Sequence, residues 1–176
     1  PDVYSIRVTI TDNYSGSVTS TYEFVVAYDP SAGFVSGGGI IDSPVEAYVN
    51  DPSITGKATF GFTSKYKKGA TAPSGNTRFR FNMAGLDFQS STYDWLVVSG
   101  ARAQFKGKGE INSESGYGFL LTAVDGALPG GGGVDKFRIK IWVLDGGEVI
   151  YDNQPGDADD SELSTGLVGG SIKIVK

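Results

Sequence analysis

The stretch KFRIKIWV at residues 136–143 alternates between two kinds of side chain. One parity carries Phe, Ile, Ile and Val, and the other carries Lys, Arg, Lys and Trp. Successive side chains of a β-strand point to opposite faces, so this pattern predicts a strand with one face in a core.

The same period of two recurs along most of the chain. It is found in residues 3–10, 22–26, 58–66, 78–83, 93–98, 101–107, 117–123, 149–151 and 171–175. Turn-forming residues separate these stretches, and 26 of the 176 residues are glycine. No sustained helical period is present. We therefore predict an all-β protein, an antiparallel β-sandwich with a jelly-roll-like architecture.

The first two alternating stretches predict a β-hairpin, because residues 12–16 between them have the composition of a turn. Pro30 cannot continue a central strand, which divides the chain into a terminal hairpin at 1–29 and a sandwich at 30–176. The chain begins as if in mid-strand, so we expect it to be part of a longer protein. The apolar hairpin face needs a cover, either the following domain or a second copy paired by strand addition.

The composition excludes several functions. The chain has no Cys and no His, which removes Ser-His-Asp and Cys-His catalysis, disulfides and the usual zinc sites. No pair of Glu residues stands out, and the glycine runs at 37–39 and 130–133 lack the context of a phosphate-binding loop. No apolar run approaches the roughly 20 residues of a membrane span. We expect no catalysis, no membrane insertion and, given a net charge of −5 and no known motif, no nucleic-acid binding.

Charge is distributed unevenly. Residues 57–108 contain nine Lys or Arg and two Asp, a net charge of +7, whereas residues 1–56 and 125–162 each carry −6. The basic block predicts either a surface that attracts polyanions or strands that lie beside acidic ones in the fold.

The acidic block suggests calcium, which takes six to eight oxygen ligands from carboxylates, amides and main-chain carbonyls. The candidate ligands lie in loops rich in Asp and Gly, and they are Asp125, Asp135, Asp152, Asn153, Asp157, Asp159 and Asp160. The alternative is that they are solvated turn residues, which have the same composition.

A second candidate site follows from the opening stretch. If Phe137 and its parity face the core, then Trp142 lies on the charged face with Arg138 and Lys140. An exposed aromatic ring beside cations would suit an acidic polysaccharide, or it could stack within the sheet. Trp95 shares its parity with apolar neighbours, so we predict that it lies in the core.

Residues 4–16 and 19–26 resemble the last two strands of a polycystic-kidney-disease (PKD) repeat, an immunoglobulin-like spacer of secreted bacterial proteins. The chain from residue 32 resembles the post-COAP module that follows such repeats, in the runs 33–39, 56–62, 93–103, 135–142, 149–153 and 169–174. The resemblance implies a secreted, extracellular module on the bacterial cell surface. Its implied role is structural or adhesive, with polysaccharides, cell-surface components or neighbouring domains as partners.

Overall fold

A computed structural model of the protein describes residues 2–27 and 33–175. Its strands are β1 (Asp2–Thr11), β2 (Ser17–Ala27), β3 (Phe34–Ser43), β4 (Gly56–Lys65), β5 (Ser74–Phe81), β6 (Leu86–Ser99), β7 (Arg102–Ile111), β8 (Glu114–Val124), β9 (Lys136–Val143), β10 (Val149–Asp152) and β11 (Gly169–Val175). One 3₁₀ turn, η1 (Asn82–Ala84), lies between β5 and β6. The all-β prediction is confirmed.

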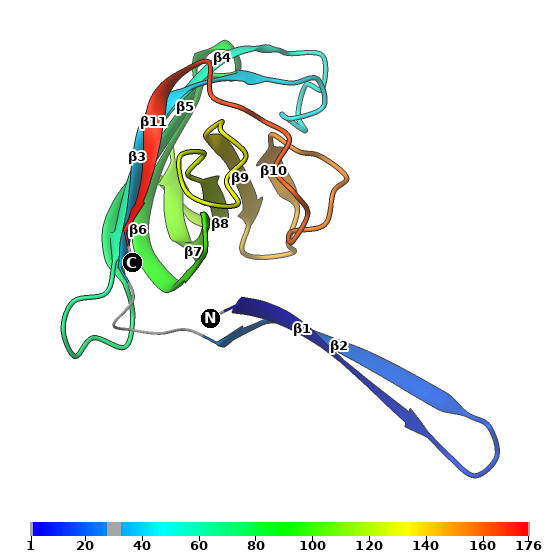
Figure 1. Ribbon diagram of the computed structural model, residues 1–176. Helices are drawn as coiled ribbons and strands as arrows, with labels where there is room; N and C mark the ends of the chain where they lie inside the picture. Colours follow the sequence, from blue (N-terminus) through cyan, green and yellow to red (C-terminus); the bar gives the residue numbers. More distant parts are fainter. Residues whose placement is uncertain (1, 28–32, 176) are drawn as a thin grey trace.

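Nine strands form one antiparallel sheet in the order β10-β9-β8-β7-β6-β5-β4-β3-β11. From β3 to β10 each strand pairs with its neighbour in sequence, which is the connectivity of a meander, and β11 returns to pair with β3. Figure 1 shows the sheet curling until β8–β10 face β3–β5 and β11. This curl turns one sheet into the two facing layers of a sandwich.

The core between the layers is dominated by phenylalanine. The ring of Phe137 on β9 stacks on that of Phe60 on β4 at a centroid separation of 3.9 Å, although these strands are far apart in the sheet order. Phe79, Phe105 and Phe119 are likewise fully buried. The inward parity predicted for residues 101–107, 117–123 and 137–143 is confirmed at Ala103, Phe105, Phe119, Leu121, Phe137 and Ile139, which belong to the core cluster, whereas Ala101 lies in a separate cluster.

The edges of the large sheet are covered by main-chain and side-chain groups. The loop after β3 pairs with β10 through an antiparallel bridge between Tyr48 and Tyr151, and Asp152 N donates to Ala47 O at 2.9 Å. At the other end of the order, Ile172 N and Ile174 N of β11 point away from β3 and donate to side-chain carboxylates. Such coverage removes the open edge that strand pairing with another molecule requires.

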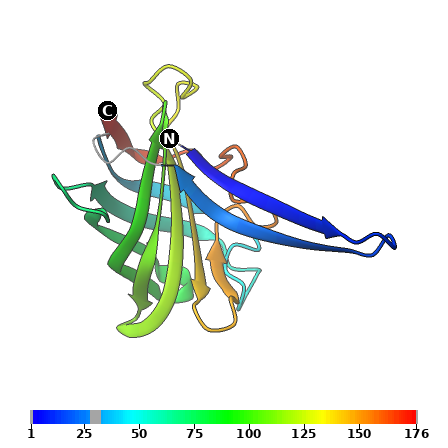
Figure 2. The same ribbon diagram turned by 90° about the horizontal axis from the view of Figure 1, so that it is seen from below.

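β1 and β2 form a separate two-stranded sheet, as the alternation predicts. Its turn is held by Asp12, whose Oδ1 accepts hydrogen bonds from Tyr14 N and Gly16 N, each 2.8 Å long. The hairpin contacts β6 near its start and then projects away from the sandwich (Figures 1 and 2). The predicted boundary at Pro30 lies outside the described residues.

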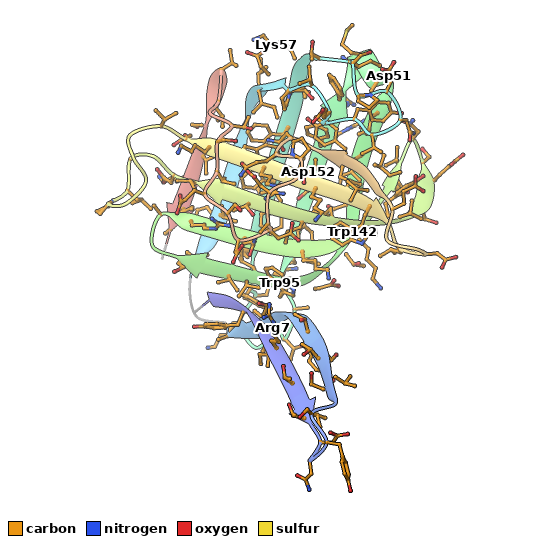
Figure 3. The ribbon with its side chains drawn as sticks, turned by 90° about the vertical axis from the view of Figure 1, so that its right-hand side faces the viewer. Arg7, Asp51, Lys57, Trp95, Trp142 and Asp152 are labelled. Carbon is orange, nitrogen blue, oxygen red and sulfur yellow. The ribbon has the colours of Figure 1, made fainter. Side chains whose placement is uncertain are left out.

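Trp95 does not lie in the core, and this prediction is wrong. The pairing of β6 with β7 shifts between Tyr93 and Trp95, so the irregularity changes which residues face inward. Tyr93, Leu96 and Val98 are part of the core cluster, while Trp95 is half-buried on the outer side. Figure 3 shows Trp95 on the part of the sheet nearest the hairpin.

Candidate functional site

A row of polar side chains crosses the outer face of three neighbouring strands. Gln104 on β7 is paired in register with Thr122 on β8, which is paired with Arg138 on β9. All three are buried, because the covering loop, residues 153–168 between β10 and β11, lies over them. Leu163 of this loop is buried with Ala101 and Val124 in a small second cluster. On the outer face of these strands, polar side chains are thus buried beneath the covering loop.

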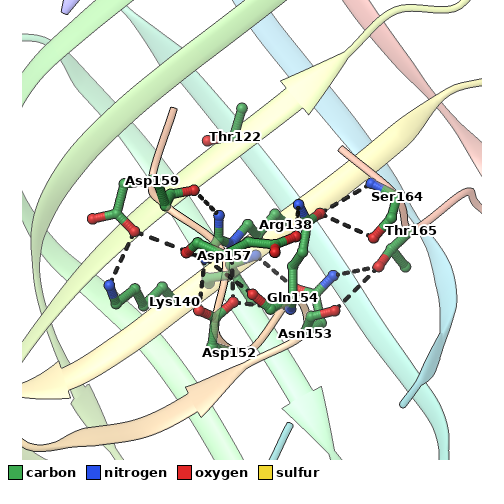
Figure 4. Close-up of polar contacts among 12 residues, drawn as sticks. Thr122, Arg138, Lys140, Asp152, Asn153, Gln154, Asp157, Asp159, Ser164 and Thr165 are labelled. Carbon is green, nitrogen blue, oxygen red and sulfur yellow. Dashed lines mark hydrogen bonds and ion pairs between the residues drawn. The ribbon is translucent and has the colours of Figure 1, made fainter. Parts of the chain in front are cut away.

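Arg138 organises the covering loop (Figure 4). Its Nε and Nη2 donate to the two oxygens of Asp152 at 2.9 and 2.8 Å. Nη2 also donates to the carbonyls of Gln154 and Asp157, and Nη1 donates to that of Ala158 at 2.7 Å. A planar guanidinium provides five fixed donors, which makes it able to collect one carboxylate and three carbonyls at once.

Arg138 is 3% exposed, so its charge is costly to bury without these partners. Burial opposes ionisation, but the hydrogen bond and charge of Asp152, with the charges of Asp159 and Asp157, outweigh it and raise the pKa of Arg138. The guanidinium therefore stays charged and holds the loop across the pH range in which the fold exists.

Two amide side chains add further hydrogen bonds between the loop and the sheet and within the loop. Asn153 accepts from Ile139 N and donates to Phe137 O, so it continues the ladder on the edge of β9. Gln154 donates to Glu162 O and accepts from Ser164 N, which joins the two limbs of the loop. Asp157 accepts from Gln154 Nε2 at 2.8 Å. Four of the predicted metal ligands of this region, Asp152, Asn153, Asp157 and Asp159, thus have hydrogen-bond partners within the protein.

Asp125 and Asp135 lie apart from the covering loop and have a different role. Asp125 accepts from Ala127 N and, through its other oxygen, from Ile174 N at 3.1 Å. Asp135 accepts from Gly126 N and, at 2.7 Å, from Ile172 N. On the edge of β11 that faces away from β3, each carboxylate thus accepts the main-chain hydrogen bond that the carbonyl of a further strand would accept.

The seven candidate ligands do not gather in one place. Across residues 2–27 and 33–175, no group of three or more His, Cys, Asp or Glu is placed to hold a metal ion. Asp152 is paired with Arg138, Asp159 with Lys140 at 3.0 Å, and Asp160 is exposed. Calcium binding stays a prediction.

The exposed charged face that we predicted around Trp142 is present only in part. The parity is correct, but Arg138 is buried under the covering loop and presents no surface. Trp142 is half-buried and lies over Gly118, where a Cβ would be 2.6 Å from the indole. Lys106 Nζ is 5.5 Å from the ring centroid, a cation–π contact within the sheet. Carbohydrate binding through Trp142 stays a prediction, tested by affinity electrophoresis of Trp142→Ala.

The basic block of residues 57–108 covers β4–β7 and the connections between them, and three of its cations pair with acids. Lys57 pairs with Asp42 across β3 and β4, and Arg78 and Arg80 both pair with Asp87 of β6. The hydrogen bond from Arg78 lowers the pKa of Asp87 below its usual value, with the charges of both arginines acting in the same direction. Of these three pairs, the one between Lys57 and Asp42 joins the basic block to an acidic block, as one of the two alternatives predicted.

A hollow of about 380 Å³ lies where the covering loop meets the hairpin. It is lined by Val3, Tyr4 and Ser5 of β1, by Gln104 and Lys140 of the large sheet, and by residues 157–160. Gln104 and Tyr4 were not among the predicted site residues. Gln104 occupies a polar position in its strand, and its burial depends on a loop more than fifty residues away in sequence.

The fold and these contacts define an all-β sandwich protein whose acidic loop is organised by a buried arginine. Comparisons with protein-family models, with curated proteins and with solved structures find no match for the chain. The resemblance to PKD and post-COAP modules therefore stays a prediction. Among the described residues, no helix has the length and apolar character needed to cross a membrane.

Proposed function

We propose that this protein is a non-catalytic structural or adhesive module of an extracellular protein, and that it attaches to a neighbouring β-domain through one face of its hairpin. The observation that carries the proposal is the apolar face of β1–β2. It consists of seven side chains that are 38 to 73% exposed: Tyr4, Ile6, Val8, Ile10, Val18, Tyr22 and Val25.

These residues share a face because of the hairpin register. Ile10 is opposite Val18, Ile6 is opposite Tyr22 and, beyond a bulge, Tyr4 is opposite Val25. The other face carries Thr9 and Thr19, whose hydroxyls are hydrogen-bonded at 3.0 Å. A hairpin with one apolar and one polar face has the pattern of a sheet that packs against another sheet.

Energetics favour a partner for this face. Two strands alone are marginally stable in water, and contiguous exposed apolar surface marks interaction sites in soluble proteins. The nine-stranded sheet already buries its apolar residues in its own core and gives the hairpin contact mainly near β6. A second β-layer over the apolar face would bury it.

The test uses the intact chain and two double variants. We expect the wild-type protein to enhance the fluorescence of an apolar dye such as anilinonaphthalene sulfonate, and Ile10→Ser with Val18→Ser to remove most of that signal. Thr9→Ala with Thr19→Ala on the polar face is the matched control and leaves it unchanged. A wild-type protein that binds no dye would contradict the proposal.

A second candidate function is self-assembly by strand addition. Each strand of the hairpin has a ladder partner on one side, because its sheet has two strands. Free main-chain groups on such an edge pair readily with another strand. Light scattering over a wide concentration range separates the two candidates: a dimer lost with Thr19→Pro on β2 supports assembly, and a monomer throughout supports attachment to a different domain.

A further inference from the structure

The hollow between the covering loop and the hairpin contains a polar atom that the fold leaves without a partner. Gln104 is 7% exposed and forms part of the wall. Its Nε2 donates to Thr122 Oγ1 and to Asp159 O, each at 3.0 Å, which fixes the orientation of the amide. No donor among the described residues reaches its Oε1. That oxygen is still open to solvent, since the one sealed and partnerless side-chain atom in the described part of the chain is Ser64 Oγ.

The nitrogen of this amide is satisfied inside the wall, whereas its oxygen opens to solvent and has no donor among the described residues. The amide cannot rotate to use this oxygen elsewhere without losing both bonds of its nitrogen. Gln104 Oε1 is therefore a fixed acceptor that a bound group with an N–H or O–H could satisfy.

The other groups around the hollow are also acceptors. Asp159 uses Oδ1 for Lys140 and has no described donor at Oδ2, and Asp157 uses Oδ2 for Gln154. Asp160 is exposed and has no ion pair or hydrogen bond in the described part of the chain. Three carboxylates and one ammonium line the hollow, so its formal charge is negative. Such a wall repels anions and attracts cations.

Tyr4 adds an aromatic residue to this lining, on the hairpin side. An aromatic residue together with carboxylates and an amide oxygen is the set of groups that recognises an ammonium ion. The three N–H donors of a primary ammonium match separate acceptors, and the faces of aromatic rings attract cations. Lys140, already held by Asp159 in the wall, shows that the carboxylates can accept such a group.

We propose that this hollow is a binding site for a small ligand that carries a primary ammonium group. Gln104 Oε1 and the carboxylate of Asp160 accept hydrogen bonds from its N–H groups. The site shares Tyr4 with the apolar face of the hairpin, but the attachment is tested at Ile10 and Val18, which do not line the hollow.

The experiment is a titration of the intact, isotope-labelled protein followed by NMR. The first probe is Nα-acetyl-lysine methylamide, and the matched probe is the same compound acetylated at Nε, which lacks the positive charge. We expect saturable shifts at Gln104 and at residues 157–160 with the first probe and none with the second. Glucosamine and glucose form a second pair, and binding of glucosamine alone would show that a sugar can supply the same ammonium.

Variants test which residues contact the ammonium group. Asp160→Asn, at an exposed position without a partner, should weaken the binding about two- to fivefold, the range of an exposed charge pair. Asp145→Asn on the turn after β9 makes the same charge change away from the hollow and should leave the binding unchanged. Gln104→Leu should weaken it about tenfold, with the NMR spectrum of the variant showing whether the fold is retained.

Three results would overturn the proposal. Equal shifts with the charged and the Nε-acetylated lysine probes would show that the ammonium is not recognised. Shifts that never saturate, or that spread evenly over the acidic surface, would show screening without a site. Calcium chloride that produces the same local shifts at much lower concentration than either amine would assign the hollow to a metal ion.

Discussion

The nine-stranded sheet and the β1–β2 hairpin have the same alternation of apolar and polar residues in sequence, yet the two are stabilised in very different ways. In the large sheet, Ile139 is fully buried, and in the hairpin, Ile10 is 71% exposed. The edges of the large sheet are covered by Asp125, Asp135 and the loop after β3, whereas each hairpin strand has one neighbour. Identical local patterns thus lead to a self-sufficient sandwich in one region and to a surface in need of a partner in the other.

The largest effect is expected among the polar side chains buried beneath the covering loop. Arg138→Met leaves Asp152 buried without its charge partner and releases three carbonyls of the covering loop, so we expect a loss of about 3–5 kcal/mol in the free energy of unfolding. Arg78→Met, at the exposed pair with Asp87, should cost far less, because ion pairs exposed to water contribute little to stability. Denaturant titrations measure both, and a loss at Arg138 no larger than at Arg78 would refute the role given to the buried pair.

The contrast between the two regions can be tested with one substitution made twice. Ile139→Ala removes a fully buried side chain and should cost about 2–5 kcal/mol. Ile10→Ala removes a side chain that is mostly in water, and we expect a change within about 0.5 kcal/mol in the isolated protein. If a large loss accompanies Ile10→Ala, the apolar face of the hairpin already has a cover, contrary to the attachment proposed for it.

The carboxylates on the edge of β11 should have an intermediate effect. Asp125→Ala leaves Ile174 N–H without its acceptor at a buried edge, at a cost of about 1–3 kcal/mol. Asp125→Asn keeps an oxygen at the same place and should lower the free energy of unfolding by less. Melting curves of both variants, recorded with calcium and with a chelator, also test the calcium prediction: a melting temperature of the wild-type protein that rises with calcium would support it.

The smallest effect concerns pH. The pKa of Asp87 is lowered in the folded state by Arg78, so the folded protein binds this proton less readily than the unfolded chain. The pair therefore stabilises the fold above the ordinary aspartate pKa of about 3.8, and this contribution is lost as the pH falls below that value. We expect at most about 1 kcal/mol at this exposed site, seen as a shallower acid dependence in Asp87→Asn. An unchanged acid dependence would argue against the pair.

Much of the fold could be predicted from the sequence because the signal is local. The alternation in residues 136–143 identifies both the strand and its inward side chains, and the hairpin with its turn at Asp12 follows from the same reasoning. The prediction for Trp95 was wrong because a single irregularity in the pairing of β6 with β7 reverses the parity, and nothing in the apolar run around it marks the position.

The candidate sites were harder to predict, since burial on an outer face depends on distant chain segments. Arg138 has the expected parity, but the covering loop arrives from residues 153–168 and turns an exposed cation into the centre of a buried network. The same loop buries Gln104 and leaves its amide oxygen without a donor. No local signal marks this loop, because the run Asp-Asn-Gln at 152–154 has the composition of an ordinary turn.

The return of β11 to β3 has a consequence for how the chain folds. From β3 to β10 every pairing joins strands that are adjacent in sequence, so these hairpins can form early and independently. The pairing of β11 with β3 and the bridge between Tyr48 and Tyr151 join residues about a hundred or more positions apart. Such long-range contacts must overcome a large loop-closure entropy and form late. Until the last strand has docked, the edge of β3 and one end of the phenylalanine core are open to solvent, and it is in that interval that we expect the protein to be most prone to aggregation.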